Sequence, residues 1–212
     1  GMAISNLLDN APIVESTGRS YPVEIIYIGS ANKSRGNNSR DTNRQKDSSA
    51  LENHVAQTVL RAVREQSGDL LVFLPGQREI RRIQALLENH DALTGIKIHA
   101  LFGESPIAQQ QSALQPDTGG ARKIILSTSI AETSLTIDGV SVVIDAGLVR
   151  SIRFDPRRAM SGLVTINVSQ ATAEQRAGRA GRQQPGSCYR LWSESQHATL
   201  ARYPQPEILQ TD

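Results

Sequence analysis

With 212 residues, the chain is long enough for one sizeable α/β domain with a well-formed core. Hydrophobic residues make up 38% of it and charged residues 21%, which is ordinary for a globular protein. The single cysteine, Cys188, excludes an internal disulfide and a cysteine-rich metal site, and it fits a reducing, cytoplasmic compartment. No apolar run reaches the roughly 18 residues that a membrane span needs, and the N-terminus lacks a signal-peptide pattern.

Segment 30–50 is the part of the chain least able to bury itself. It has almost no apolar side chains and carries five lysines or arginines against two aspartates, whereas the net charge of the whole chain is only +2. We predict a disordered, solvated loop here, and the alternative is a nucleic-acid-binding arm. The remainder is close to neutral, so any basic surface on the folded part is local.

Apolar runs of strand length alternate with segments of helical spacing along most of the chain. The predicted strands are 22–28, 70–74, 96–102, 123–127, 140–146 and 188–192. The predicted helices are 51–66, 77–89, 106–114, a short helix after 127, 171–182 and 193–203. Within 150–169, two strand-like runs flank the turn-rich stretch DPRRAMSG, which predicts a β-hairpin.

This alternation predicts an α/β domain with a mostly parallel sheet that helices cover on both faces. Parallel sheets of this kind bind ligands beyond the carboxyl ends of their strands. The candidate functional loops are therefore those that follow Leu74, Phe102, Ser127 and Ala146.

The densest positive charge lies in EQRAGRAGR, residues 174–182. On a helix of about 100° per residue, Gln175, Arg179 and Arg182 form one stripe, while Arg176 points elsewhere. Guanidinium groups bind phosphate oxygens and a nearby glutamine can orient a water, as phosphoryl transfer requires. The two glycines cost helix stability, which indicates that another surface lies very close. The alternative is a solvated basic helix, and the chain contains no GxxxxGK[ST] phosphate-binding loop.

A second motif, STSIAETSLTIDGV at 127–140, follows a predicted strand and is rich in hydroxyl groups. Six serines and threonines precede Asp138 in it. Such side chains, together with the first N–H groups of a short helix, suit contacts to phosphate and ribose. The alternative is a loop whose hydroxyls only cap the local backbone.

In this order, STSIAETSLTIDGV and QRAGRAGR resemble motifs V and VI of the DEAH-box RNA helicases. LLVFLPGQREI (70–80) resembles motif IV of that family, and LFGESPIAQQQ (101–111) its motif IVa region. RFDPRRAMSGL and the C-terminal CYRLWSESQHATLARYPQPEILQTD are similar to the bacterial HrpB-type branch. The resemblance runs from about residue 14 to the C-terminus, apart from 30–50.

The resemblance implies a three-layer RecA-like domain, the second of two motor domains. In the family the first domain carries the P-loop and the carboxylates that hold ATP and Mg²⁺. By resemblance, Arg179 and Arg182 are arginine fingers on the γ-phosphate, Gln175 helps to position the attacking water, and Arg176 pairs within the domain. This chain alone is then expected to be inactive and to hold no metal.

The resemblance also assigns residues to the nucleic acid. Thr128 and Thr133 match positions near the RNA backbone. Gly76 and Gly103, at strand ends, match loops whose backbone approaches the RNA strand, and the hairpin at 150–169 matches one that helps to separate strands. Such contacts are expected to depend on salt and to ignore sequence.

For the nucleotide, Ser134, Thr136 and Asp138 match positions that face it, with Asp138 near the ribose. Leu114 stands where some eukaryotic relatives have an aromatic residue that stacks on adenine, so we expect loose base specificity. Ser129 stands where the family usually has asparagine, so a side-chain contact there is expected to be shortened or lost.

The predicted organisation is a lead-in at 1–20, a RecA-like domain at 21–203 and the start of a further element at 204–212. The expected partners are RNA, with DNA as an alternative, and the first motor domain; we expect a monomer with no membrane association. A stand-alone nucleic-acid-binding module remains as another function. A phosphosugar- or dinucleotide-binding domain fits less well, because no GxGxxG follows the first strand.

Overall fold

The structure is a computed structural model, and it describes residues 9, 12, 21–29, 42–132, 137–155 and 160–205. Apart from residues 9, 12, 204 and 205, the predicted lead-in and the predicted further element lie outside this part. Of the predicted loop at 30–50, only 42–50 is described. Among the described residues, no helix combines the length and apolar character needed to cross a bilayer.

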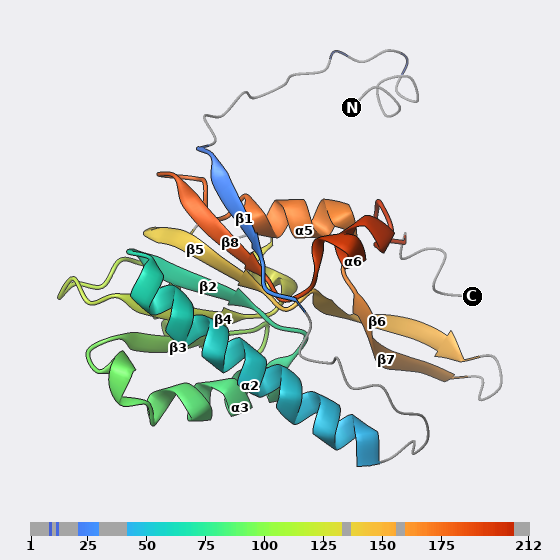
Figure 1. Cartoon of the computed structure of the whole chain (residues 1–212), viewed down its shortest axis with the longest axis horizontal. Coiled ribbons are helices and arrows are strands. Elements are labelled where there is room, and N and C mark those ends of the chain that lie inside the picture. The colour runs from blue at the N-terminus through green and yellow to red at the C-terminus, as the bar shows by residue number, and fades with distance from the viewer. Residues whose placement is uncertain are drawn as a thin grey trace.

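Six parallel strands form the central sheet, in the order β1-β8-β5-β2-β4-β3 (Figure 1). The strands are β1 (Val23–Tyr27), β2 (Asp69–Phe73), β3 (Lys97–Leu101), β4 (Lys123–Ser127), β5 (Val140–Asp145) and β8 (Gly186–Arg190). In the middle of the sheet, Val72 of β2 lies opposite both Leu126 of β4 and Ile144 of β5. The predicted alternation and parallel sheet are confirmed, and each strand begins and ends within two residues of its predicted bounds.

Helices cover both faces of this sheet, as predicted. They are α2 (Thr42–Glu65), α3 (Gln77–Glu88), α4 (Ile107–Leu114), α5 (Gln170–Ala177) and α6 (Glu194–Thr199), with short 3₁₀ turns η1 (Asp91–Leu93) and η2 (Ser129–Ala131). Helices α2 and α3 bury Val55, Val59, Ile80 and Ile83 against one face. On the other face, α4, η2 and α5 contribute small buried alanines, which lets them pack close to the strands.

Helix α2 is longer than the sequence predicted. It begins at Thr42, so 42–50 is helical and the expected loop is wrong for that stretch. Residues from Leu51 onward are anchored by the buried Val55 and Val59. Once such a helix is nucleated, each further residue adds a hydrogen bond without a new nucleation cost, so it can extend into a polar stretch.

The predicted hairpin is confirmed as β6 (Leu148–Asp155) paired with β7 (Met160–Asn167). It is separate from the main sheet and extends from the right of Figure 1, where the strands have their carboxyl ends. We call this side of the sheet the carboxyl edge and the opposite side, at the left of Figure 1, the amino edge.

Candidate nucleotide and nucleic-acid interface

Three of the residues predicted to lie near nucleic acid meet at the carboxyl edge. Gly76, Gly103 and Thr128 follow β2, β3 and β4, which are neighbours in the sheet order β2-β4-β3. Backbone hydrogen bonds tie the loops together: the Leu74 N–H donates to the Ser127 carbonyl (2.8 Å) and the Thr128 N–H to the Leu101 carbonyl (3.2 Å). The fourth residue of this set, Thr133, lies outside the described residues.

The two glycines of this edge differ in how open they are. Gly103 is exposed, and a Cβ built on it would meet no atom within 4 Å. Gly76 is buried, and a Cβ on it would lie 2.7 Å from Nε of Arg150, whose guanidinium faces Glu79 (3.5 Å). The side-chain face of Gly103 is therefore open, whereas the guanidinium of Arg150 fills the corresponding space at Gly76.

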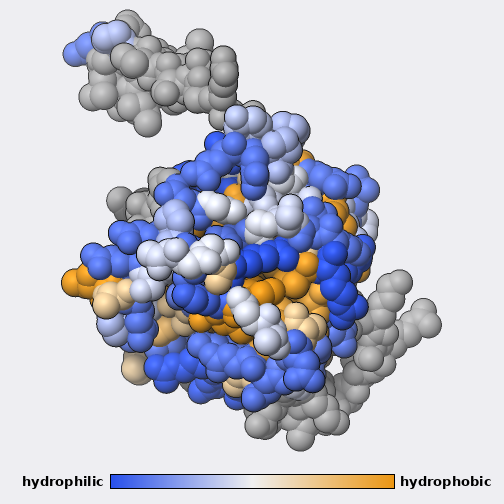
Figure 2. Space-filling model, turned by 90° about the vertical axis from the view of Figure 1, so that its left-hand side faces the viewer, coloured by the Kyte–Doolittle hydropathy of each residue, from blue (hydrophilic) through white to orange (hydrophobic). Residues whose placement is uncertain are grey.

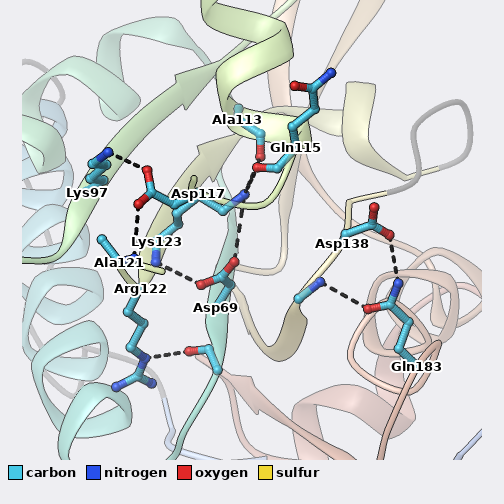
Figure 3. Close-up of polar contacts among 12 residues, drawn as sticks. Asp69, Lys97, Ala113, Gln115, Asp117, Ala121, Arg122, Lys123, Asp138 and Gln183 are labelled. Atoms are coloured by element: carbon cyan, nitrogen blue, oxygen red, sulfur yellow. Dashed lines mark hydrogen bonds and ion pairs between the residues drawn. The ribbon is translucent and has the colours of Figure 1, made fainter. Parts of the chain in front are cut away.

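Asp138, predicted to face the nucleotide, lies at the amino edge instead, just before β5. Its carboxylate accepts a hydrogen bond from Nε2 of Gln183 (2.7 Å), and the Gln183 amide oxygen accepts one from the Gly139 N–H (3.0 Å) (Figure 3). The Asp138 N–H also donates to the carbonyl of Leu114 (3.4 Å). The predicted ligand residue Asp138 therefore precedes a strand, unlike the candidate loops that follow strands. Ser134 and Thr136 lie outside the described residues.

A buried lysine, Lys123, fixes the end of α4 next to Asp138. Lys123 is 1% exposed, and its Nζ donates to the carbonyls of Ala113 (3.1 Å) and Gln115 (2.6 Å) and lies 3.7 Å from a carboxylate oxygen of Asp69 (Figure 3). The lysine thus caps the C-terminus of α4, where helix carbonyls lack partners and a cation is favoured. This fixes Leu114, the residue matched to an adenine-side position, beside Asp138.

The arginine segment departs from the predicted geometry. Helix α5 ends at Ala177, not near 182, and the N–H groups of 179, 180 and 181 donate to the carbonyls three residues earlier. Arg179 and Arg182 therefore do not share one α-helical stripe with Gln175. We attribute this change from α-helical to tighter, three-residue hydrogen bonding to Gly181. Its carbonyl accepts a hydrogen bond from the Tyr21 N–H (2.8 Å) just before β1.

The three predicted catalytic side chains also differ in exposure. Gln175 and Arg182 are exposed, whereas Arg179 is only 4% exposed and its Nη2 donates to the backbone carbonyl of Glu132. Burial lowers the pKa of the Arg179 guanidinium, and the neighbouring charge of Arg182 lowers it further. An arginine keeps its charge under such perturbation, so Arg179 remains a fixed cation at this place.

Gly181 supplies the very close surface that the glycines of the segment predicted. A Cβ on Gly181 would lie 2.5 Å from the Tyr21 carbonyl oxygen and 2.7 Å from Cγ2 of Val23. We expect Gly181→Ala to lower the free energy of unfolding by about 1–3 kcal/mol, because backbone must shift to admit the methyl group. Urea unfolding followed by the fluorescence of Trp192, the only tryptophan, measures this.

Gly178→Ala is the matched control for that substitution. Gly178 has helical backbone angles, and a Cβ there would make only ordinary contact, 3.4 Å from the Glu174 carbonyl oxygen. The free energy of unfolding is expected to equal or slightly exceed that of the wild type, since alanine has a higher helix propensity than glycine. If both variants lost the same unfolding free energy, the close contact of Gly181 with Tyr21 would not be the reason that alanine is unfavourable at position 181.

Arg176 is completely buried and joins four parts of the domain. Its guanidinium contacts Oε1 of Glu132 (2.6 Å) and Oδ1 of Asp145 (2.7 Å), reaches the carbonyl of Leu148 (3.4 Å) and lies over the ring of Phe73 (4.9 Å). Burial alone would lower the pKa of Arg176, but the carboxylates of Asp145 and Glu132 more than offset this and raise it. The prediction that Arg176 pairs within the domain is confirmed.

Sequence reasoning missed three residues of this arrangement: Glu132, Asp145 and Gln183. Glu132 stood inside the hydroxyl-rich motif, and its spacing from the arginines gave no sign that its carboxylate and its carbonyl serve two of them. A charged residue ending an apolar strand, as Asp145 does, was the available signal for a buried partner. Within the described ranges, no group of three or more His, Cys, Asp or Glu side chains could hold a metal ion.

Comparison with known proteins agrees with this architecture. The family described as "Helicase conserved C-terminal domain" matches residues 52–184, from α2 to just beyond Arg182. This chain belongs to the helicase C-terminal domain family. The resemblance to DEAH-box helicases and the RecA-like fold are likewise confirmed by the individual relatives.

Among the relatives, ATP-dependent RNA helicase HrpB of Escherichia coli (strain K12) is 39% identical over 99% of this chain and 24% of its own length. Pre-mRNA-splicing factor ATP-dependent RNA helicase prp22 of Schizosaccharomyces pombe is 37% identical over 96% of this chain and 17% of its own length. A crystal structure of the E. coli DEAH/RHA helicase HrpB superposes with a TM-score of 0.85 at 38% identity, covering 100% of this chain and 25% of that one. The chain thus spans about a quarter or less of the length of these relatives.

Proposed function

We propose that this chain is the second motor domain of an ATP-dependent RNA helicase. In this role it completes an ATPase site whose P-loop and Mg²⁺ ligands belong to a first RecA-like domain. It also holds the backbone of RNA, with DNA as the alternative. The observation that carries the proposal is the separation of its two sets of residues. Gly103 and Thr128 lie at the carboxyl edge, whereas Asp138 and Gln183 lie at the amino edge.

At the nucleotide side, the chain's contribution is charge and position. Arg179 and Arg182 would place guanidinium groups against phosphate oxygens, where negative charge develops during phosphoryl transfer. Gln175, exposed on α5, would orient water, and Asp138 would accept a hydrogen bond from a ribose hydroxyl. The nucleotide and the metal would be bound by the first domain. Closure of the two domains would then bring Arg179, Arg182, Gln175 and Asp138 into contact with the nucleotide.

The buried Arg176 network supports coupling between the two sides. The same Glu132 accepts from Arg176 through its carboxylate and from Arg179 through its carbonyl, and it lies four residues after Thr128. Arg176 also reaches Leu148, the first residue of the hairpin. A shift of the nucleotide-side arginines would therefore be transmitted through rigid, buried contacts to the loops proposed to hold RNA.

The surface at the amino edge is compatible with a docked domain. Figure 2 views the molecule from this side and shows an apolar area near the centre, surrounded by hydrophilic residues. An apolar centre within a polar rim is the usual anatomy of a protein interface. This supports the proposal that a first motor domain faces the amino edge.

The proposal predicts that Gly103→Leu weakens RNA binding without harming the fold. The added side chain has room, but it blocks the approach of a phosphate to the backbone. The loss of one charge-assisted hydrogen bond should weaken RNA affinity about tenfold. The measurement is fluorescence anisotropy of a labelled single-stranded RNA titrated with the 212-residue chain. The effect is expected to be the same for RNAs of different sequence.

Ala92→Leu is the control, because Ala92 is an exposed residue of η1 that precedes β3 at the amino edge, whereas Gly103 follows β3 at the carboxyl edge. It should bind RNA as the wild type does. Unchanged affinity for Gly103→Leu, with wild-type binding intact, would contradict a nucleic-acid path over this loop.

A further inference from the structure

We propose that the outer face of α3 is a second nucleic-acid contact, one that binds backbone phosphates and continues the path from the Gly103 loop. The location of the first contact rests on the proposed function. The α3 contact itself rests on the charge, shape and continuity of a helix face to whose arginines the resemblance assigns no role.

Three arginines of α3 form one exposed stripe. Arg78, Arg81 and Arg82 stand at spacings of three and four residues, so they share a helix face, while Ile80 and Ile83 point into the core. Together with Gln77 they line a hollow of about 430 Å³. A concavity walled by guanidinium and amide groups has only donors and one amide oxygen to offer, which suits an anion with several acceptor oxygens.

The stripe keeps a local excess of positive charge. Arg82 forms an ion pair with Glu52 (2.9 Å), and Glu79 on the same helix faces Arg150 (3.5 Å). Among the described residues, Arg78 and Arg81 have no ion pair. Like charges three residues apart on a helix repel, so the arrangement disfavours the isolated domain slightly and favours a bound polyanion.

The stripe is also continuous with the loop proposed to hold RNA. Helix α3 begins at the carboxyl edge directly after Gly76, and Arg81 lines a second hollow, of about 380 Å³, along the outer edge of β3. That second hollow includes Phe102, the residue before Gly103, and Gln109. A hollow lined by both an arginine and a phenylalanine fits a single strand, in which phosphates alternate with bases that can stack, better than it fits an acidic protein segment.

The test is the double variant Arg78→Gln/Arg81→Gln in the 212-residue chain, titrated with labelled single-stranded RNA at several salt concentrations. Glutamine keeps helix propensity and removes only charge. We expect about tenfold weaker binding at low salt and a slope of log affinity against log salt that is smaller by about 1.4, about 0.7 for each lost phosphate contact. The control, Arg61→Gln/Arg64→Gln, removes two exposed arginines with the same spacing from α2 at the amino edge and should leave the slope unchanged.

The outcomes separate this inference from the proposed function. If Gly103→Leu weakens binding and the α3 double variant does not, the α3 contact is wrong while the proposed path over Gly103 stands. If only the double variant weakens binding, the α3 contact stands without that path. If the double variant weakens binding to polyglutamate as much as to RNA, or if the α2 control has the same effect as the α3 variant, the assignment to nucleic acid is overturned.

Discussion

Arg176→Ala should lower the free energy of unfolding of this chain by about 3–5 kcal/mol, because it removes the partner of a fully buried carboxylate, Asp145, and of a partly buried one, Glu132. Asp145 is fully buried, and one of its carboxylate oxygens already has no partner among the described residues. The loss is large beside the 5–15 kcal/mol by which domains are typically stable. Urea unfolding followed by Trp192 fluorescence and circular dichroism measures it.

Arg176→Lys keeps the charge but replaces the fork by a single ammonium group, so it cannot hold Glu132 and Asp145 as the guanidinium does. We expect an intermediate loss of stability, which gives a measurable variant even if the alanine variant does not fold. Arg61→Ala is the control, since its ion pair with Glu65 lies on the exposed surface of α2 and should matter little. A stability of Arg176→Ala close to wild type would show that the two carboxylates find other partners.

The predicted sheet illustrates what local patterning can establish. Runs such as KIILS predicted β4 with both ends correct, because the middle of a parallel strand that is buried on both faces is apolar. The order of strands is a different matter. Nothing in VEIIY or GSCYR indicates that β1 and β8 pair at one side of the sheet, because that choice is made by tertiary packing.

The sequence could not show how the arginines of 174–182 are placed. Three arginines within seven residues led to the prediction of phosphate binding, but the structure gives them three different environments: Arg176 is in the core, Arg179 is nearly buried and Arg182 is exposed. A helical projection treats residues 174–182 as one helix. The helix ends at Ala177 because the contact of Gly181 with Tyr21, some 160 residues away along the chain, draws the segment toward β1.

The position of Asp138 required the fold as well. The general rule for parallel sheets concerns loops that follow strands, but 128–139 runs from the carboxyl edge after β4 to the amino edge before β5. A sequence shows that these residues form one motif. Only the topology shows that Thr128 and Asp138 lie at opposite edges of the sheet, a placement that would let one motif contact the two ligands that we propose.

Arg179→Ala and Arg182→Ala should each reduce ATP turnover by about 10³–10⁵-fold in the longer protein that we propose, in which a P-loop domain accompanies this chain. Each removes positive charge where negative charge builds up in the transition state, so the fall should appear in kcat more than in KM. ATP hydrolysis is measured with and without single-stranded RNA. Arg202→Ala, which removes an exposed arginine near α6, is the control and should turn over ATP normally.

The two arginines are distinguishable because their surroundings differ. Arg182 is exposed, so Arg182→Ala should shift the unfolding transition less than Arg179→Ala does and should leave RNA affinity unchanged while turnover falls. Arg179 donates to the Glu132 carbonyl, so Arg179→Ala should also loosen the link to Thr128 and reduce the stimulation by RNA. If turnover survives both substitutions while RNA binding weakens, the arginines hold nucleic acid only, and a stand-alone binding module becomes the better reading of this domain.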